Sequence, residues 1–235
     1  MTRGTLLWSF QFVFRLPEAD AQAFLPSALT PLTRDGWAFL NVAIGEFESL
    51  RPASRPIKLG RSGHIAVVRL YARQPGTPDV GFYGIRAICD DARSLRLTHR
   101  LSTTPTEQEM IEVFDDTVGT VQLQIDAETN STSVALDTRG KPKLAEGSPF
   151  ASLSEAATFL KPPHRLFVLD SDGGILTTEI ERLEDGRGKG KRDHRLVRVP
   201  KAEWGLPEVA SLPLEICFDI APLQYRWPTG FALAP

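Results

Sequence analysis

Alternation of apolar and polar residues recurs along this chain, and it limits the chain to a β-rich fold. Trp8, Phe10, Phe12 and Phe14 occupy every second position, so four aromatic side chains share one face of a strand. Residues 119–126 alternate valine, leucine and isoleucine with polar residues, as expected for an antiparallel sheet with one buried and one solvated face.

About ten strands and three short helices are predicted. The strands are expected at residues 8–14, 37–50, 64–73, 79–89, 110–114, 119–126, 131–137, 164–169, 175–182, 194–199 and 212–220, and the helices at residues 18–25, 90–101 and 152–160. Since an open sheet leaves edges unpaired, so many strands in one domain spanning residues 1–235 predict curved antiparallel sheets that form a closed or cone-like β-barrel. A closed sheet of this size often encloses a ligand cavity.

Bulk composition excludes several classes of protein. Hydrophobic residues make up 42% of the chain, which is enough to fill a core, and the net charge of −2 gives no bias toward nucleic acid or an anionic membrane. Neither a signal peptide nor an apolar run of about 20 residues is evident, so a cytoplasmic protein is expected. Cys89 and Cys217 lie in apolar surroundings and are expected to be buried thiols; their spacing does not suggest a zinc site.

Several short motifs occur in a familiar order. They are residues 24–26 (FLP), 35–40 (DGWAFL), 68–73 (VRLYAR), 80–84 (VGFYG), 159–160 (FL) and 165–167 (RLF). In this order the chain resembles the uncharacterised YqjF-like branch of the acetoacetate-decarboxylase-like superfamily, which implies a cone-like barrel around a central pocket. The chain departs from that branch at Pro162 and Pro163, where a Glu-Arg pair is usual, and at Val67, where an Asn is usual.

The resemblance makes the lysines informative. Decarboxylases of this superfamily use a lysine amine as a Schiff-base nucleophile, and such an amine must be partly neutral near pH 7. Residues 99–110, where the resemblance places paired lysines, contain none. Lys58 and Lys141, the nearest lysines, lie in polar loops rich in Pro and Gly and are expected to be solvated. We therefore expect that the chain is not an acetoacetate decarboxylase, and we expect no cofactor.

Two strand arginines are candidates for ligand binding. Arg69 and Arg86 are expected to face each other across a hairpin, where an inward-pointing guanidinium could clamp a carboxylate. The alternative is that both point outward, because buried charges are rare. Tyr71 and Tyr83 could add hydroxyls to the same cavity or could pack as strand aromatics.

His64 and His99 are the candidates for acid–base chemistry, because imidazole titrates near neutrality; the alternative for each is a surface or structural role. His164 and His194 lack the spacing of a metal site. The basic segment 186–192 lacks the strand–loop–helix context of a phosphate-binding loop and is expected to be a hairpin tip.

Three hypotheses about function follow. The first is a protein that binds a small organic acid or keto acid in a central pocket without the Schiff-base lysine. The second is a lyase or hydratase that uses His or Glu. The third is an interaction protein that uses residues 186–192; nucleic acid, membrane and metal partners are not expected, and a homo-oligomer is left open.

Overall fold

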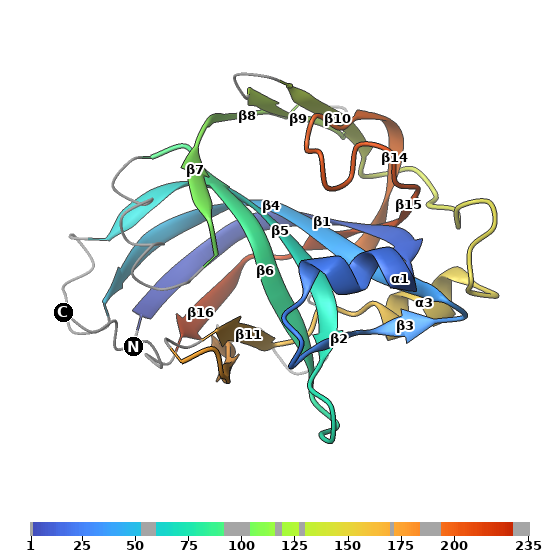
Figure 1. The fold of residues 1–235 in the computed structure, drawn as a ribbon. Coiled ribbons are helices and arrows are strands. Elements are labelled where there is room, and N and C mark those ends of the chain that lie inside the picture. The colour runs from blue at the N-terminus through green and yellow to red at the C-terminus, as the bar shows by residue number, and fades with distance from the viewer. Residues whose placement is uncertain are drawn as a thin grey trace.

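One large mixed sheet organises the chain (Figure 1). The computed structural model describes residues 2–52, 60–91, 104–115, 119–126, 130–169, 172–183 and 194–227. The strands are β1 (Thr2–Pro17), β2 (Thr30–Pro31), β3 (Thr33–Arg34), β4 (Trp37–Pro52), β5 (Arg61–Arg73), β6 (Val80–Cys89), β7 (Thr106–Gln108), β8 (Met110–Asp115), β9 (Thr120–Asp126), β10 (Thr132–Asp137), β11 (Arg165–Leu169), β12 (Ile175–Glu179), β13 (Glu181–Leu183), β14 (His194–Glu203), β15 (Leu214–Ile220) and β16 (Leu223–Trp227). The helices are α1 (Glu18–Ala21), the 3₁₀ turn η1 (Gln22–Phe24) and α3 (Leu153–Phe159).

The strand order confirms a mainly β protein. The main path runs β12-β11-β6-β5-β4-β1-β15-β14-β10-β9-β8. Most neighbouring strands are antiparallel, whereas β6 pairs in parallel with both β7 and β11. Among the described strands the two ends of the path, β8 and β12, do not pair with each other, so the sheet is open and the expected closure of the barrel is not confirmed.

The central strands bury both of their faces. Strands β8, β9 and β10 lie over one side of the curved surface formed by β1, β4, β5 and β6 (Figure 1), and Phe12 and Leu123 belong to the core between them. We call this side the inner face. The opposite, outer face carries a second core, in which Phe39 packs with Ala156 and Leu160 of the α3 region. Successive residues of a strand point to opposite faces, so a strand with two buried faces needs apolar residues at consecutive positions. Phe12 and Val13 of β1 are such a pair.

The helix predicted at residues 152–160 is confirmed, and its N-cap residue is Ser152. Ser152 accepts a hydrogen bond from the Glu155 amide at 3.2 Å, as expected for an N-cap, and α3 follows. The helix expected at residues 18–25 is instead a single α-turn followed by η1. Most of the helix expected at residues 90–101 lies outside the described residues. None of the described helices is long and apolar enough to cross a membrane.

Two strand boundaries differ from expectation. No strand was predicted after residue 220, yet β16 pairs with β1 from Thr2 opposite Trp227 to Leu6 opposite Leu223. The strand expected at residues 175–182 divides into β12, which pairs with β11, and β13, which pairs with β16.

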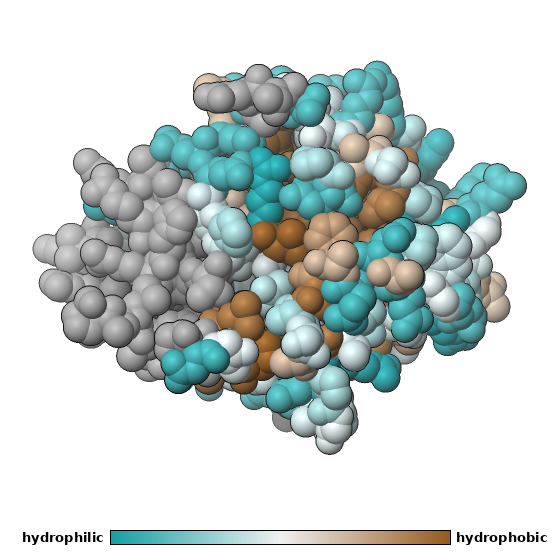
Figure 2. Space-filling view, viewed as in Figure 1, coloured by the Kyte–Doolittle hydropathy of each residue, from teal (hydrophilic) through white to brown (hydrophobic). Residues whose placement is uncertain are grey.

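Figure 2 shows that hydrophobic residues reach the surface in the middle of the face in view, with hydrophilic residues around them.

Candidate functional site

Four side chains form a row across the inner face, near one end of the central strands. Trp8 of β1 is opposite Glu46 of β4, and Glu46 is opposite His64 of β5. Asp90 directly follows β6 and completes the row beside His64. The Trp8 indole nitrogen donates to Glu46 at 2.9 Å, and its ring lies 5.9 Å from the imidazole of His64. Neighbouring strands in register therefore bring together residues that are up to 82 positions apart in sequence.

Asp90 fixes the position of His64 through two contacts. One carboxylate oxygen accepts the His64 backbone amide at 2.9 Å, and the other lies 2.7 Å from His64 Nδ1. Gly63 makes this approach possible, because a Cβ at that position would lie 2.7 Å from the Asp90 carboxylate. A carboxylate on Nδ1 orients the ring and leaves Nε2 as the nitrogen that can exchange a proton with a ligand.

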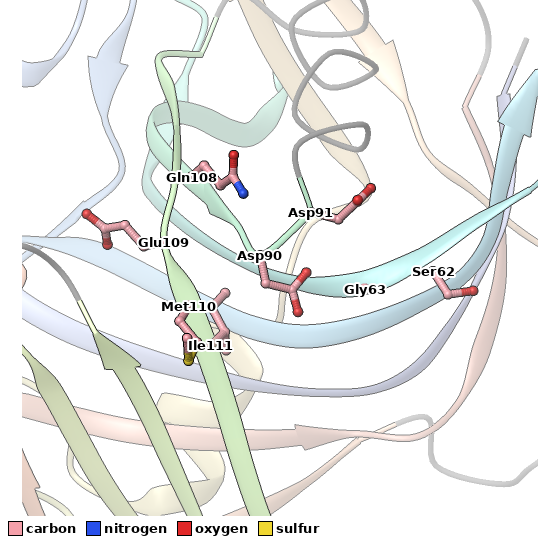
Figure 3. Close-up of a pocket in the computed structure, with 8 residues that line it drawn as sticks. All are labelled: Ser62, Gly63, Asp90, Asp91, Gln108, Glu109, Met110 and Ile111. Atoms are coloured by element: carbon pink, nitrogen blue, oxygen red, sulfur yellow. The ribbon is translucent and has the colours of Figure 1, made fainter.

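A cavity lies beside this pair. It has a volume of about 540 Å³, within the range of small-molecule sites. Its lining comprises Ser62, Gly63, Asp90, Asp91, Gln108, Glu109, Met110 and Ile111 (Figure 3). The Asp90 carboxylate is directed toward Gly63, whereas Glu109 points to the other side of the β7–β8 segment (Figure 3).

Glu109 points toward Arg86, which is the second charged centre of the inner face. Arg86 forms ion pairs with Glu107, with Glu109 at 3.4 Å and with Glu208 at 4.0 Å. Burial alone would lower the pKa of Arg86, but the hydrogen bond that Arg86 donates to Glu107 and the three negative charges outweigh it and raise that pKa. Arg86 is opposite Val68, four residues along β5 from His64, which corresponds to about 13 Å.

The predicted pairing of Arg69 with Arg86 is wrong. A β-bulge between Val68 and Arg69 shifts the register, so Arg69 is opposite Gly84 instead. This extra residue puts the two arginines on opposite faces of the sheet. On the outer face Arg69 donates to Asn41 at 2.8 Å, and its guanidinium lies 3.7 Å from the centre of the Phe82 ring.

The two tyrosines do not line the cavity. Tyr71 is fully buried on the outer face and donates to the Leu160 carbonyl at 2.7 Å. Burial raises its pKa strongly, and the positive charge of Arg69 offsets only part of that effect. Tyr83 is opposite Leu70 and packs against the inner core, where burial raises its pKa.

Several predictions fall on residues that the structure does not describe. These are the roles of His99 and of the basic segment 186–192. Of the site residues predicted from sequence, neither His64 nor Arg86 lines the cavity. His64 contacts the lining residue Asp90, and Arg86 contacts the lining residue Glu109. Sequence reasoning missed Trp8, Glu46, Asp90 and Glu109 as site residues.

The described lysines are all exposed. They are Lys141, Lys143, Lys161 and Lys201; Lys58, Lys189 and Lys191 fall outside the described residues. Within the described part of the chain, no group of three His, Cys, Asp or Glu side chains is arranged to hold a metal ion.

Comparisons with known proteins identify the fold. No protein-family model matches the chain, and no curated protein sequence matches it. Among solved structures, an acetoacetate decarboxylase-like enzyme from Sphingomonas wittichii RW1 is similar with a TM-score of 0.60 and 12% identity, over 95% of this chain and 90% of that one. The acetoacetate decarboxylase of Legionella pneumophila matches with a TM-score of 0.57 and 12% identity, over 95% and 85% of the two chains.

A third similar structure holds a small molecule. The enduracididine biosynthesis enzyme MppR, complexed with pyruvate, matches with a TM-score of 0.59 and 11% identity, over 96% of this chain and 87% of that one. At such identities the similarity concerns the backbone and not the site residues. The chain has the fold of the acetoacetate decarboxylase-like enzymes.

Proposed function

We propose that this chain binds a small organic acid or keto acid in the cavity beside His64 and Asp90, and that it does so without a Schiff base. The fold is shared with an enzyme that was solved with pyruvate, and the cavity volume suits a small molecule. A Schiff-base lysine needs an apolar or cationic environment that keeps its amine partly neutral. The exposed positions of the described lysines favour binding without a covalent bond.

The contact between His64 and Asp90 carries a second candidate function, a lyase or hydratase. With Nδ1 held by Asp90 at 2.7 Å, the imidazole can take a proton at Nε2 from a carbon next to a carbonyl group. Glu109 lines the cavity, and its carboxylate would supply a second group that can give or accept a proton if it turned from Arg86 toward the cavity. General acid–base catalysis of this kind contributes about 10²–10⁴-fold to a rate.

Binding and proton transfer can be tested separately. Isothermal titration with pyruvate measures binding, and proton NMR in D₂O measures exchange of the pyruvate methyl protons. We expect saturable binding by the wild type and by His64→Gln, with exchange lost in His64→Gln. His164→Gln is the matched control, because His164 is exposed and does not line the cavity. If neither pyruvate nor acetoacetate binds, the first proposal is wrong; if His64→Gln still exchanges the protons at the wild-type rate, the second is wrong.

We retain three narrower predictions as proposals. They are membership of the YqjF-like branch, a barrel closed around the cavity, and a cytoplasmic location. The order of motifs such as residues 35–40 and 80–84 supports the first, and the position of β8–β10 over the inner face supports the second. A crystal structure that showed β8 joined to β12 through further pairing would establish closure.

A further inference from the structure

Glu109 belongs both to the cavity wall and to the ion-pair cluster around Arg86. It lines the cavity, and one oxygen of its carboxylate lies 3.4 Å from Arg86 Nη2. Arg86 itself is not among the residues that line the cavity. A molecule in the cavity therefore meets Glu109 before it can meet Arg86.

We propose that the Glu109 carboxylate occupies Arg86 in place of a ligand, and that the carboxylate of a bound organic acid displaces it. This inference rests on the proposed function, because it names the group that recognises the ligand carboxylate. Glu109 then acts as an internal competitor that sets the affinity and selectivity of the site.

The contact between Glu109 and Arg86 is weak enough to be exchanged. Charge-assisted hydrogen bonds between a guanidinium and a carboxylate are normally about 2.7–2.9 Å long, shorter than the 3.4 Å observed here. Within the described residues, Arg86 Nε is buried without a hydrogen-bond partner. A carboxylate that binds side-on can accept from Nε and Nη2 together, and it would pair a donor that Glu109 leaves unpaired.

The charges around Arg86 also permit the exchange. Glu107, Glu109 and Glu208 give three negative charges around one guanidinium, whose side chain is only 18% exposed. A fourth carboxylate added to this cluster would meet strong repulsion. If a ligand carboxylate replaces that of Glu109, the number of charges around Arg86 stays the same, and Glu109 can turn toward the cavity.

The exchange predicts opposite effects for two substitutions. Glu109→Gln removes the competing charge and should lower the Kd for pyruvate by roughly 3- to 10-fold. A tenfold change in Kd is about what one strong contact contributes. Arg86→Gln should weaken binding by at least about tenfold. Glu112→Gln, on the same chain segment but outside the cavity lining, is the matched control and should leave affinity unchanged.

Titration calorimetry with pyruvate, and with pyruvamide as its uncharged analogue, tests this directly. We expect Glu109→Gln to tighten pyruvate binding and to leave pyruvamide binding unchanged. If pyruvate binds to the wild type and Glu109→Gln weakens or does not alter that binding, the exchange is wrong while the proposed function stands. If pyruvate binds to neither protein, the proposed function itself fails. Arg86→Gln removes the cation that three glutamates share and could fail to fold, so Glu109→Gln decides the question.

Discussion

Asp90→Asn tests the arrangement at the cavity wall with the smallest possible change in shape. The carboxylate of Asp90 accepts from the His64 backbone amide at 2.9 Å and contacts His64 Nδ1 at 2.7 Å. Asparagine has only one oxygen acceptor, so it cannot accept at both places. If the Asn oxygen accepts from the His64 amide, the Asn NH2 group faces Nδ1 and can donate to it only when the ring proton moves to Nε2.

The size of the effect follows from the exposure of the pair. A hydrogen bond to a charged group contributes about 1.5–3 kcal/mol when it is buried. The side chains of His64 and Asp90 are 26% and 22% exposed, so solvent screening reduces this to about 1–2 kcal/mol. For a chain of this length each kcal/mol shifts Tm by about 2–4 °C, so Asp90→Asn should lower Tm by about 2–8 °C.

Thermal unfolding and nitrogen NMR of the imidazole check this prediction together. In the wild type Nδ1 should carry the proton that Asp90 accepts, and in Asp90→Asn the Nδ1-protonated form should lose its preference. Asp35→Asn is the matched control, because Asp35 is exposed and its ion pair with Arg34 lies at the surface, so its effect should stay below about 0.5 kcal/mol. A variant with wild-type Tm and wild-type ring nitrogen shifts would refute the pairing of Asp90 with His64.

Three further predictions concern stability. Glu215→Gln leaves the buried guanidinium of Arg15 without its ionic partner at 2.7 Å. It should lower the free energy of unfolding, measured in urea, by about 3–5 kcal/mol. A decrease below about 1 kcal/mol would contradict this prediction. Tyr71→Phe removes a buried hydrogen bond and should cost about 1 kcal/mol at neutral pH. Because burial raises the Tyr71 pKa above its ordinary value of 10.0, the folded wild type holds this proton more tightly and loses stability as the pH rises above about 10. The difference in free energy of unfolding between the wild type and Tyr71→Phe should therefore decrease in alkaline buffer. A difference that does not change with pH would contradict the argument. Gly45→Ala places a Cβ 2.6 Å from the Trp8 carbonyl oxygen and should destabilise by more than about 1 kcal/mol, measured by the midpoint of thermal unfolding; an unchanged midpoint would argue against this close approach.

Strand positions could be predicted because the alternation is local. The aromatic residues of β1 and the apolar residues of β9 lie two positions apart, and each set faces a core in the structure. The lengths of strands could not be predicted in this way. β1 extends from Thr2 to Pro17 because β4 pairs along all of it and β15 and β16 pair along its second edge. Those partners are distant in sequence.

The candidate site was predicted only in part, because it depends on register. His64 and Arg86 could be proposed from their residue types, but their neighbours depend on how the strands align. The bulges between Leu6 and Trp8 and between Val68 and Arg69 each change which side chains share a face. No local pattern in the sequence marks either bulge, so the row from Trp8 to Asp90 and the separation of Arg69 from Arg86 became evident only from the strand pairing.

Covalent trapping tests the central claim most directly. The protein would be incubated with pyruvate or acetoacetate, reduced with borohydride, and analysed by intact-mass spectrometry, with binding measured in parallel on the same preparation. We expect saturable binding together with an unchanged protein mass, because no described lysine is buried at the site. A stable adduct on a lysine, above all on Lys58, which precedes the lining residue Ser62 by four positions in the sequence, would contradict the account.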